Sequence, residues 1–212
     1  MRLLRGLYAI TPDQPAHQRP LADLVAETLA GGARIIQYRN KGADRNRRHA
    51  EATAVLKLCR QAGALLIVND DLELAVSIAA DGIHLGRGDA DPRQVRARLG
   101  ADAIVGISCY NLFARAREAQ DIGANYAAFG RFFPSGTKPD AVPASPELLR
   151  RARRELRLPL VAIGGITPEN GGPLIGAGAD MLAVVNGVFA AADVRAAAQA
   201  FTELFAKETL IQ

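Results

Sequence analysis

The pattern of hydrophobic positions along the chain predicts a regular alternation of strands and helices. Apolar runs of strand length occur at residues 4–11, 33–39, 64–68, 82–86, 103–108, 126–129, 160–163 and 181–185. Segments with apolar residues at helical spacing follow them at residues 21–30, 44–61, 72–80, 92–99, 112–122, 146–156, 168–175 and 194–207. Several strand runs are apolar throughout, which is typical of strands that are buried on both faces.

The count of eight strand–helix units decides between two α/β architectures. Strict alternation predicts a parallel sheet with right-handed crossovers. Eight units favour a closed (β/α)8 barrel, the TIM barrel, over an open doubly wound sheet. Because no linker or shift in composition marks a boundary, we expect residues 1–212 to form a single (β/α)8 barrel domain.

Composition and charge exclude several kinds of partner. No apolar run approaches the ~20 residues of a membrane helix, so no membrane partner is expected. Much of the net charge of +4 comes from arginines in the predicted helices, which we interpret as solvated faces. The chain has no tryptophan and only four tyrosines to interleave with these charges, so no nucleic-acid partner is expected. Cys59 and Cys109 lie far apart without metal-ligand spacing, which indicates a reducing, cytoplasmic setting. A homo-oligomer is compatible with the sequence.

Polar residues gather where the predicted strands end, which is where barrel enzymes carry their active sites. In strand order they are Gln37, Arg39 and Lys41; Asn69, Asp70 and Asp71; Asp89; Ser108; Ser135, Thr137 and Lys138; Gly164 and Gly165; and Asn186 and Gly187. The amino ends of the strands carry mostly glycine and alanine turns. This asymmetry indicates a site more strongly than any single residue does.

Each group has a chemical and a structural interpretation. Arg39 and Lys41 suit a phosphate or a structural ion pair. Asp70 and Asp89 suit a Mg²⁺ ion that also binds a substrate phosphate, but Asp70 or Asp71 is equally suited to cap a helix. The residues after the last three strands suit phosphate binding or ordinary turns and a polar surface loop.

Two further residue types offer no separate chemistry. His84 lies between apolar residues, where a packed, hydrogen-bonded ring is favoured over a general base. The cysteines have no partner for nucleophilic chemistry. The residues together therefore indicate two anion-binding regions and one Mg²⁺ site, which is typical of phosphate or pyrophosphate chemistry run by positioning and electrostatics.

A series of short phrases, spread from about residue 6 to about residue 190, carries a family resemblance. In order they are Leu7-Tyr8-Ala9-Ile10-Thr11, Gln37-Tyr38-Arg39-Asn40-Lys41, Asn69-Asp70, Gly82-Ile83-His84-Leu85-Gly86 followed by Asp89, Gly106-Ile107-Ser108, Gly130 with Pro134-Ser135-Gly136-Thr137-Lys138, Ile163-Gly164-Gly165-Ile166, and Gly178-Ala179-Asp180. Their identity and order resemble those of thiamine-phosphate synthases.

The resemblance implies a reaction between two phosphorylated small molecules. Hydroxymethylpyrimidine pyrophosphate would join hydroxyethylthiazole phosphate to give thiamine phosphate and pyrophosphate. In that family the C–O bond to pyrophosphate breaks first, and the thiazole nitrogen then captures the pyrimidinylmethyl cation. The enzyme would be a Mg²⁺-dependent transferase. The main alternative is a barrel similar to thiazole tautomerase, which should lack the pyrophosphate cations and the metal carboxylates; a non-catalytic barrel that binds thiazole phosphate is a second alternative.

The resemblance also implies roles for individual residues. Asp70 and Asp89 would hold Mg²⁺. The pyrimidine pyrophosphate would be bound by Gln37, Arg39, Lys41, Asn69 and Lys138, with Ser108 beside it. The thiazole phosphate would be bound by Ser135, Thr137, Gly165, Val185 and Asn186. Arg39, Lys41, Ser108 and Lys138 would be the catalytic residues.

Three positions depart from the family pattern. Asn40 stands where an acidic residue is usual, Arg87 where glutamine is common, and Asn186 where serine is usual. Asn40 and Arg87 make the site more positive, which favours a pyrophosphate. Asn186 retains a backbone N–H and a polar side chain, so we expect all three changes to be tolerated.

Overall fold

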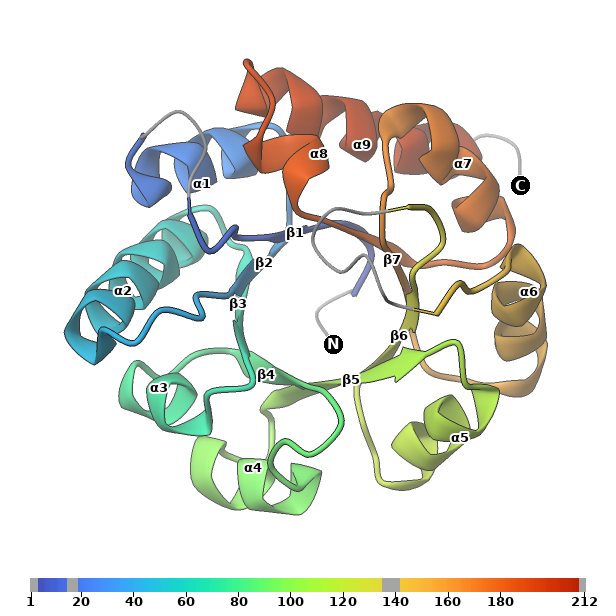
Figure 1. The fold of residues 1–212 in the computed structure, drawn as a ribbon, viewed down its shortest axis with the longest axis horizontal. Coiled ribbons are helices and arrows are strands. Elements are labelled where there is room, and N and C mark those ends of the chain that lie inside the picture. The colour runs from blue at the N-terminus through green and yellow to red at the C-terminus, as the bar shows by residue number, and fades with distance from the viewer. Residues whose placement is uncertain (1–3, 15–18, 135–141, 210–212) are drawn as a thin grey trace.

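Strands form at all eight of the predicted apolar runs, and they close into one barrel (Figure 1). The computed structural model describes residues 4–14, 19–134 and 142–209. The strands are β1 (Gly6–Ile10), β2 (Ile35–Tyr38), β3 (Leu65–Asn69), β4 (Gly82–Leu85), β5 (Ile104–Tyr110), β6 (Tyr126–Gly130), β7 (Leu160–Ile163) and β8 (Met181–Val184). Each strand pairs in parallel with its neighbours, and β8 returns to pair with β1. The predicted (β/α)8 barrel is confirmed.

Helices cover the outside of the barrel. They are α1 (Leu21–Ala30), α2 (Arg45–Gln61), α3 (Leu72–Ser77), α4 (Pro92–Leu99), α5 (Phe113–Asp121), α6 (Pro146–Glu155), α7 (Pro168–Gly176), α8 (Asn186–Phe189) and α9 (Val194–Thr209). All eight predicted helices are present. The short α8 was not predicted, because Asn186-Gly187 reads as a turn. No helix in the described part of the chain is long and apolar enough to span a membrane.

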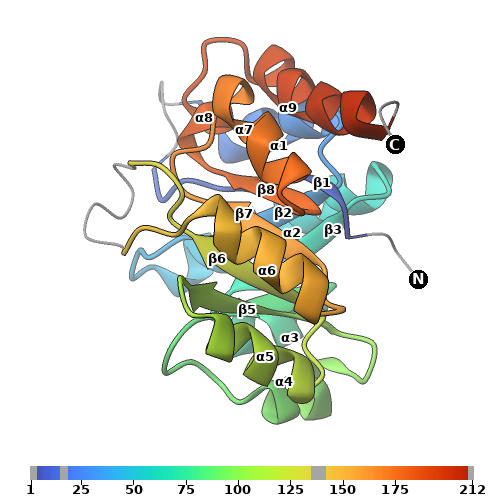
Figure 2. The same ribbon diagram turned by 90° about the vertical axis from the view of Figure 1, so that its right-hand side faces the viewer.

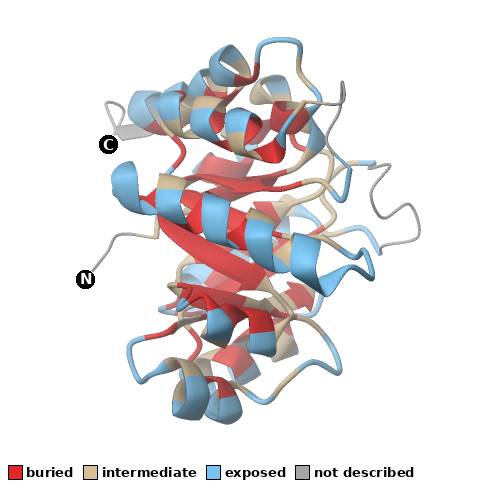
Figure 3. Ribbon diagram, turned by 90° about the vertical axis from the view of Figure 1, so that its left-hand side faces the viewer, coloured by how far each residue is buried: buried red, intermediate tan, exposed pale blue. Residues whose placement is uncertain are grey.

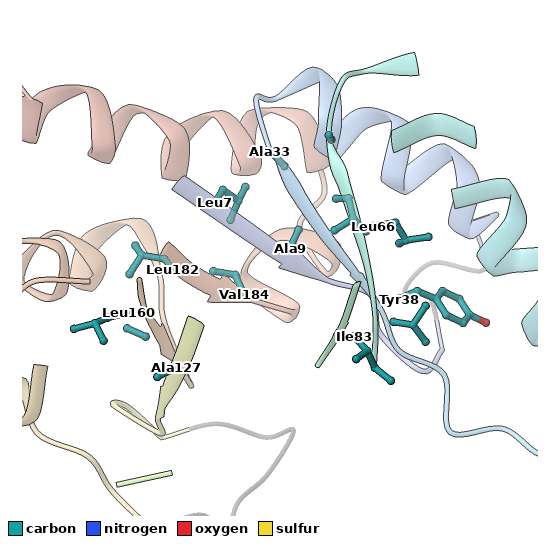
Figure 4. Close-up of a cluster of buried hydrophobic side chains, with 14 of the residues drawn as sticks. Leu7, Ala9, Ala33, Tyr38, Leu66, Ile83, Ala127, Leu160, Leu182 and Val184 are labelled. Carbon is teal, nitrogen blue, oxygen red and sulfur yellow. The ribbon is translucent and has the colours of Figure 1, made fainter. Parts of the chain in front are cut away.

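The core has two layers, separated by the sheet. The outer layer fills the space between strands and helices, and Figure 4 shows members of it on β1, β3 and β8, among them Leu7, Leu66 and Leu182. Burial coloring in Figure 3 shows the same arrangement, with buried strands and helices that are exposed on their outer side. The inner layer fills the barrel itself and consists of Tyr8, Ile10, Ile35, Leu65, Ile67, Tyr126, Ala128, Val161, Met181 and Ala183. Side chains that alternate along a strand enter different layers, as parallel barrel strands require.

A glycine in β5 makes room for the ring of Tyr126, one of the two tyrosines of the inner layer. A Cβ atom at Gly106 would lie 1.9 Å from the ring of Tyr126. Tyr126 stands beside Gly106 in the pairing of β5 with β6, so its ring passes directly over the glycine. The phenol therefore reaches across the barrel to Tyr8 on β1.

The carboxyl ends of the strands all point to one side of the barrel, on the left in Figure 2. Most of the polar residues singled out in the sequence lie at these strand ends or in the described segments that leave them. Strand β5 runs two residues beyond its predicted end, and a bulge between Ser108 and Tyr110 breaks its register with β6. Tyr110 has a positive φ of 54° and lies at the rim of the barrel. A bulge is a common means of re-aiming a side chain beside a site.

Candidate active site

A cavity of about 610 Å³ opens at the carboxyl ends of the strands. It is large enough for a ligand the size of a cofactor or a pair of small rings. Its lining includes seven of the residues predicted to form the site, namely Gln37, Arg39, Asn69, Ser108, Gly165, Val185 and Asn186. These residues come from β2, β3 and β5 on one part of the wall and from the segments after β7 and β8 on another. The structure therefore brings the two predicted anion-binding regions into one cavity.

Gln37 and Tyr8 line the floor of the cavity, and a second buried phenol, that of Tyr126, contacts Tyr8. The Gln37 Nε2 atom donates to the Tyr8 hydroxyl at 2.7 Å, and the hydroxyl oxygens of Tyr8 and Tyr126 lie 2.6 Å apart. The two rings meet edge to face. Burial raises the pKa of both phenols well above its ordinary value, so each keeps its proton at neutral pH.

His84 continues this contact toward Ser108. Its Nδ1 atom lies 3.1 Å from the Tyr126 hydroxyl, and its Nε2 atom lies 2.8 Å from Ser108 Oγ. The His84 ring is also stacked on the Tyr126 ring, with centroids 5.7 Å apart. The prediction of a packed, hydrogen-bonded histidine is confirmed.

Arg39 and Lys41, the two predicted cations that follow β2, both form ion pairs. Arg39 lines the cavity and contacts Asp13 at 2.5 Å. Lys41 is half exposed and pairs with Asp70. Asp13, which follows β1, also accepts from the Lys41 backbone N–H at 2.9 Å and so holds the segment that carries both cations. The structural ion-pair interpretation therefore applies to both residues. Both cations nevertheless stay at the rim of the barrel.

The neighbouring aspartates take different roles. Asp71 caps α3, because its Oδ1 atom accepts from the Leu74 N–H at 3.0 Å. Asp70 has a positive φ of 51° and accepts from Lys41 and from Asn69 Nδ2, the latter at 2.8 Å. The capping alternative is therefore confirmed for Asp71, whereas Asp70 belongs to the rim.

Asp89 lies in the exposed loop after β4, which pairs with β3, the strand that Asp70 directly follows. Its Oδ2 atom accepts from the Gly86 N–H at 2.6 Å. Within the described residues, no group of three or more His, Cys, Asp or Glu side chains could hold a metal ion. Mg²⁺ does not need such a group, since it is often bound by one or two carboxylates together with substrate phosphates and water.

The segment after β7 is packed tightly against the segment after β6. Gly165 has φ +62°, and a Cβ atom there would lie 2.3 Å from the Pro134 carbonyl oxygen. The Phe133 N–H also donates to the Gly164 carbonyl at 3.0 Å. The two glycines therefore serve a close approach between loops, as well as lining the cavity. Ser135, Thr137 and Lys138 lie outside the described residues.

Two of the unusual positions have clear neighbours. Asn40 donates to Glu51 on α2 at 2.9 Å, so its side chain belongs to the contact between β2 and α2. The guanidinium of Arg87 lies over the ring of Tyr110, and that of Arg115 lies over the same ring, with centroid distances of 5.6 and 5.7 Å. Tyr110 thus gathers two cations near the cavity mouth.

Sequence reasoning missed Asp13, Tyr8, Tyr110 and Tyr126 as parts of this site. A tyrosine inside an apolar run was the available signal for Tyr8 and Tyr126, because a buried phenol needs a hydrogen-bond partner. Nothing in the sequence showed that the two rings meet, since they are 118 positions apart.

The fold and cavity together define a (β/α)8-barrel protein with cations, carboxylates and amides at the carboxyl ends of its strands. Comparison with known proteins narrows this class. The family model for thiamine monophosphate synthase matches residues 7–188. A thiamine-phosphate synthase from Thiobacillus denitrificans is 53% identical over 203 residues, which cover 96% of this chain and 96% of that protein. One from Nitrosococcus oceani is 51% identical, covering 95% of this chain and 93% of the other.

A solved structure agrees with these relatives. The thiamine phosphate pyrophosphorylase from Pyrococcus furiosus superposes with a TM-score of 0.85 at 31% identity, and the match covers 95% of this chain and 96% of that one. The chain therefore belongs to the thiamine-phosphate synthase family, and it is a transferase of thiamine biosynthesis.

Proposed function

We propose that this enzyme joins hydroxymethylpyrimidine pyrophosphate to hydroxyethylthiazole phosphate, with Arg39, Lys41, Asp70 and Asp89 serving the pyrophosphate. The pyrimidine would lie against Gln37, Asn69 and Ser108. The thiazole phosphate would lie at Gly165, Val185 and Asn186, with Ser135 and Thr137 completing that side and Lys138 on the leaving group.

One observation carries this proposal: both predicted binding regions line the same cavity. A reaction between two substrates requires both to be held within bonding distance, and one cavity with two different walls meets that need. The cation-bearing wall is formed by β2 and β3, and the glycine-rich wall follows β7 and β8. A pyrophosphate on the first wall and a phosphate on the second would leave the two rings between them.

The chemistry requires a leaving group to be stabilised rather than a strong base. As the C–O bond breaks, its electron pair departs with the pyrophosphate, and the thiazole nitrogen then supplies the pair for the new C–N bond. Arg39 and Lys41 bear the charges that would receive the developing anion. The retained carboxylates Asp70 and Asp89 are the residues that would hold Mg²⁺, which would add positive charge at the pyrophosphate.

A turnover assay tests the proposed reaction. We expect pyrophosphate release that requires the pyrimidine pyrophosphate, the thiazole phosphate and Mg²⁺ together. Thiazole phosphate binding without release, in the presence of all three, would favour a tautomerase-like or non-catalytic barrel. The paired cations at Arg39 and Lys41 argue against those alternatives, because neither needs to bind a pyrophosphate.

The metal carboxylates are tested by substitution. We expect Asp89→Ala to lower Mg²⁺-dependent turnover by at least 100-fold, because a ligand of the ion is lost, while the thermal midpoint changes little at this exposed position. Asp102→Ala is the matched control, since it removes an exposed carboxylate at the amino-terminal side of β5. Normal turnover of the Asp89 variant at limiting Mg²⁺ would show that this carboxylate is not a ligand.

A further inference from the structure

The floor of the cavity holds a continuous chain of side-chain contacts that crosses the barrel. It runs from Gln37 through Tyr8, Tyr126 and His84 to Ser108, and its four links measure 2.7, 2.6, 3.1 and 2.8 Å. Its members come from β2, β1, β6, β4 and β5. Gln37, Tyr8 and Tyr126 are almost completely buried, so water offers them little alternative hydrogen bonding.

We propose that the Gln37 amide fixes the direction of this chain, which holds His84 as its Nε2–H tautomer and gives the cavity an acceptor at Gln37 and a donor at Ser108. Tyr8 and Tyr126 are then positioning residues. They contact each other rather than the reacting atoms, and they transmit the orientation of one end of the chain to the other.

Counting protons leads to this direction. The Gln37 Nε2 atom can only donate, so the Tyr8 oxygen accepts from it and has one proton left. The distances alone allow either donor in the Tyr8–Tyr126 and Tyr126–His84 contacts. In the proposed direction Tyr8 uses its remaining proton to donate to the Tyr126 oxygen, and Tyr126 donates its own to His84 Nδ1. Because burial keeps both phenols protonated, neither link can be made by a phenolate.

The His84 ring extends the same donor direction to Ser108. With Nδ1 as an acceptor, a neutral His84 carries its proton on Nε2 and donates to Ser108 Oγ. The Ser108 hydroxyl proton is then directed away from His84. Gln37 and Ser108 both line the cavity. In this direction the groups that the chain leaves for a ligand are the Gln37 carbonyl oxygen and the Ser108 O–H.

This pattern suits a planar heteroaromatic ring that carries an amino group beside a ring nitrogen. The amino group would donate to Gln37 Oε1, and the ring nitrogen would accept from Ser108. That the ring is the pyrimidine rests on the proposed function. The direction of the chain is a property of the protein without substrate, so the two proposals can fail separately.

The tautomer of His84 is the direct test. The chain contains three histidines, so we would use a variant with His17→Gln and His49→Gln, in which His84 gives the only imidazole signals. At pH 8, above the ordinary pKa of histidine, nitrogen NMR should show a protonated Nε2 and an unprotonated Nδ1. A protonated Nδ1 would overturn the proposal.

Replacing the donor at position 37 by an acceptor should reverse the donor direction of every hydrogen bond between Gln37 and Ser108. In Gln37→Glu an ionised carboxylate can only accept, so Tyr8 must donate to it, and His84 should change to the Nδ1–H tautomer. The measurement is made at a pH at which the carboxyl carbon resonance of Glu shows ionisation. The same change in a Tyr8→Phe background should leave the tautomer as it is with Tyr8→Phe alone. An unchanged tautomer in Gln37→Glu, or a switch that persists without the Tyr8 hydroxyl, would refute transmission through the phenols.

A kinetic readout separates positioning from simple stability. We expect Tyr126→Phe to raise KM for the pyrimidine pyrophosphate about tenfold while KM for the thiazole phosphate changes less than twofold. Equal effects on both constants would contradict the proposal. If the enzyme shows no turnover at all but His84 has the expected tautomers, the proposed function fails and the directed chain stands.

Discussion

Asp70 and Asp71 are neighbours in the sequence, yet the structure gives them separate tasks. The Asp71 side chain caps α3 and also pairs with Arg48 at 3.1 Å. Asp70 adopts a left-handed backbone conformation and turns its carboxylate to Lys41 and Asn69 at the rim. The sequence could not separate the two residues, because a helix cap and the metal ligand proposed at Asp70 would use the same carboxylate.

Paired substitutions should separate these roles. Asp71→Ala should lower the free energy of unfolding by about 1 kcal/mol, because it removes a helix cap, and should retain turnover at saturating Mg²⁺. Asp70→Ala should abolish Mg²⁺-dependent turnover while the unfolding transition shifts little. Urea unfolding and pyrophosphate release measure the two effects. Loss of turnover in both variants with equal stability would contradict this division.

The space over Gly106 makes this position sensitive to any larger side chain. Gly106→Ala should lower the free energy of unfolding by roughly 1–3 kcal/mol, because its Cβ atom collides with the buried Tyr126 ring. Gly172→Ala is the control, since a Cβ atom at Gly172 on α7 has no heavy atom within 4 Å. Thermal or urea unfolding measures both. Similar stability for the two variants would show that the Tyr126 ring moves aside without cost.

At the scale of the elements, the amino ends of the strands are held by hydrogen bonds rather than by charge pairs alone. Arg96 on α4 joins the turns that lead into β5 and β6. Its guanidinium donates to the carbonyls of Ala101, Ala103 and Gly123 at 2.9, 3.0 and 2.6 Å, and to Asn125 Oδ1 at 3.1 Å. One side chain thus ties two turns at the end of the barrel away from the cavity.

This arrangement predicts a loss of stability without a loss of chemistry. Arg96→Met should lower the free energy of unfolding by roughly 2 kcal/mol, because it leaves several carbonyls without their donor, and kcat should stay within twofold. Arg93→Met serves as the control, because it removes an exposed arginine from the same helix. Denaturant unfolding and steady-state kinetics test both. A fall in kcat with unchanged stability would place Arg96 in the catalytic machinery instead.

The elements were more predictable than the site. Apolar runs and helical spacing located all eight strands and their helices, because burial on two faces imposes these patterns on the sequence. Helix α8 could not be predicted, because its four residues are too few to show a helical period. The contacts at the cavity floor could not be predicted either, because the contact of Tyr8 with Tyr126 depends on barrel closure and on the space above Gly106. Neither barrel closure nor this space can be recognised in a short stretch of sequence.

At the scale of the whole molecule, both cysteines are buried on different elements. Cys59 lies on α2 and Cys109 on β5, and neither side chain is exposed. Burial raises the pKa of each thiol to about 12. In the unfolded chain a thiol has its ordinary pKa of ~8.5, so between these values the folded state binds more protons than the unfolded state.

The two buried thiols should make the folded protein less stable at alkaline pH. The stabilisation is complete below about pH 8.5 and is lost as the pH rises toward 12, at about 1.4 kcal/mol per pH unit per thiol. We expect the free energy of unfolding to fall between pH 9 and pH 10.5, and to fall less steeply in Cys59→Ala/Cys109→Ala. Urea titrations at several pH values test this. Equal slopes would show that the thiols do not contribute; the buried phenols would then account for the remaining slope.

Barrel closure has a consequence for synthesis of the protein on the ribosome. β1 has two partners, and they emerge at very different times: β2 follows it closely, whereas β8 is made near the end of the chain. At a translation rate of about 5–20 residues per second, one edge of β1 waits for roughly 10–35 seconds with its backbone groups unpaired. The first strand to leave the ribosome is therefore among the last to be fully paired, and a nascent chain that stalls before Met181 presents an open sheet edge to other chains.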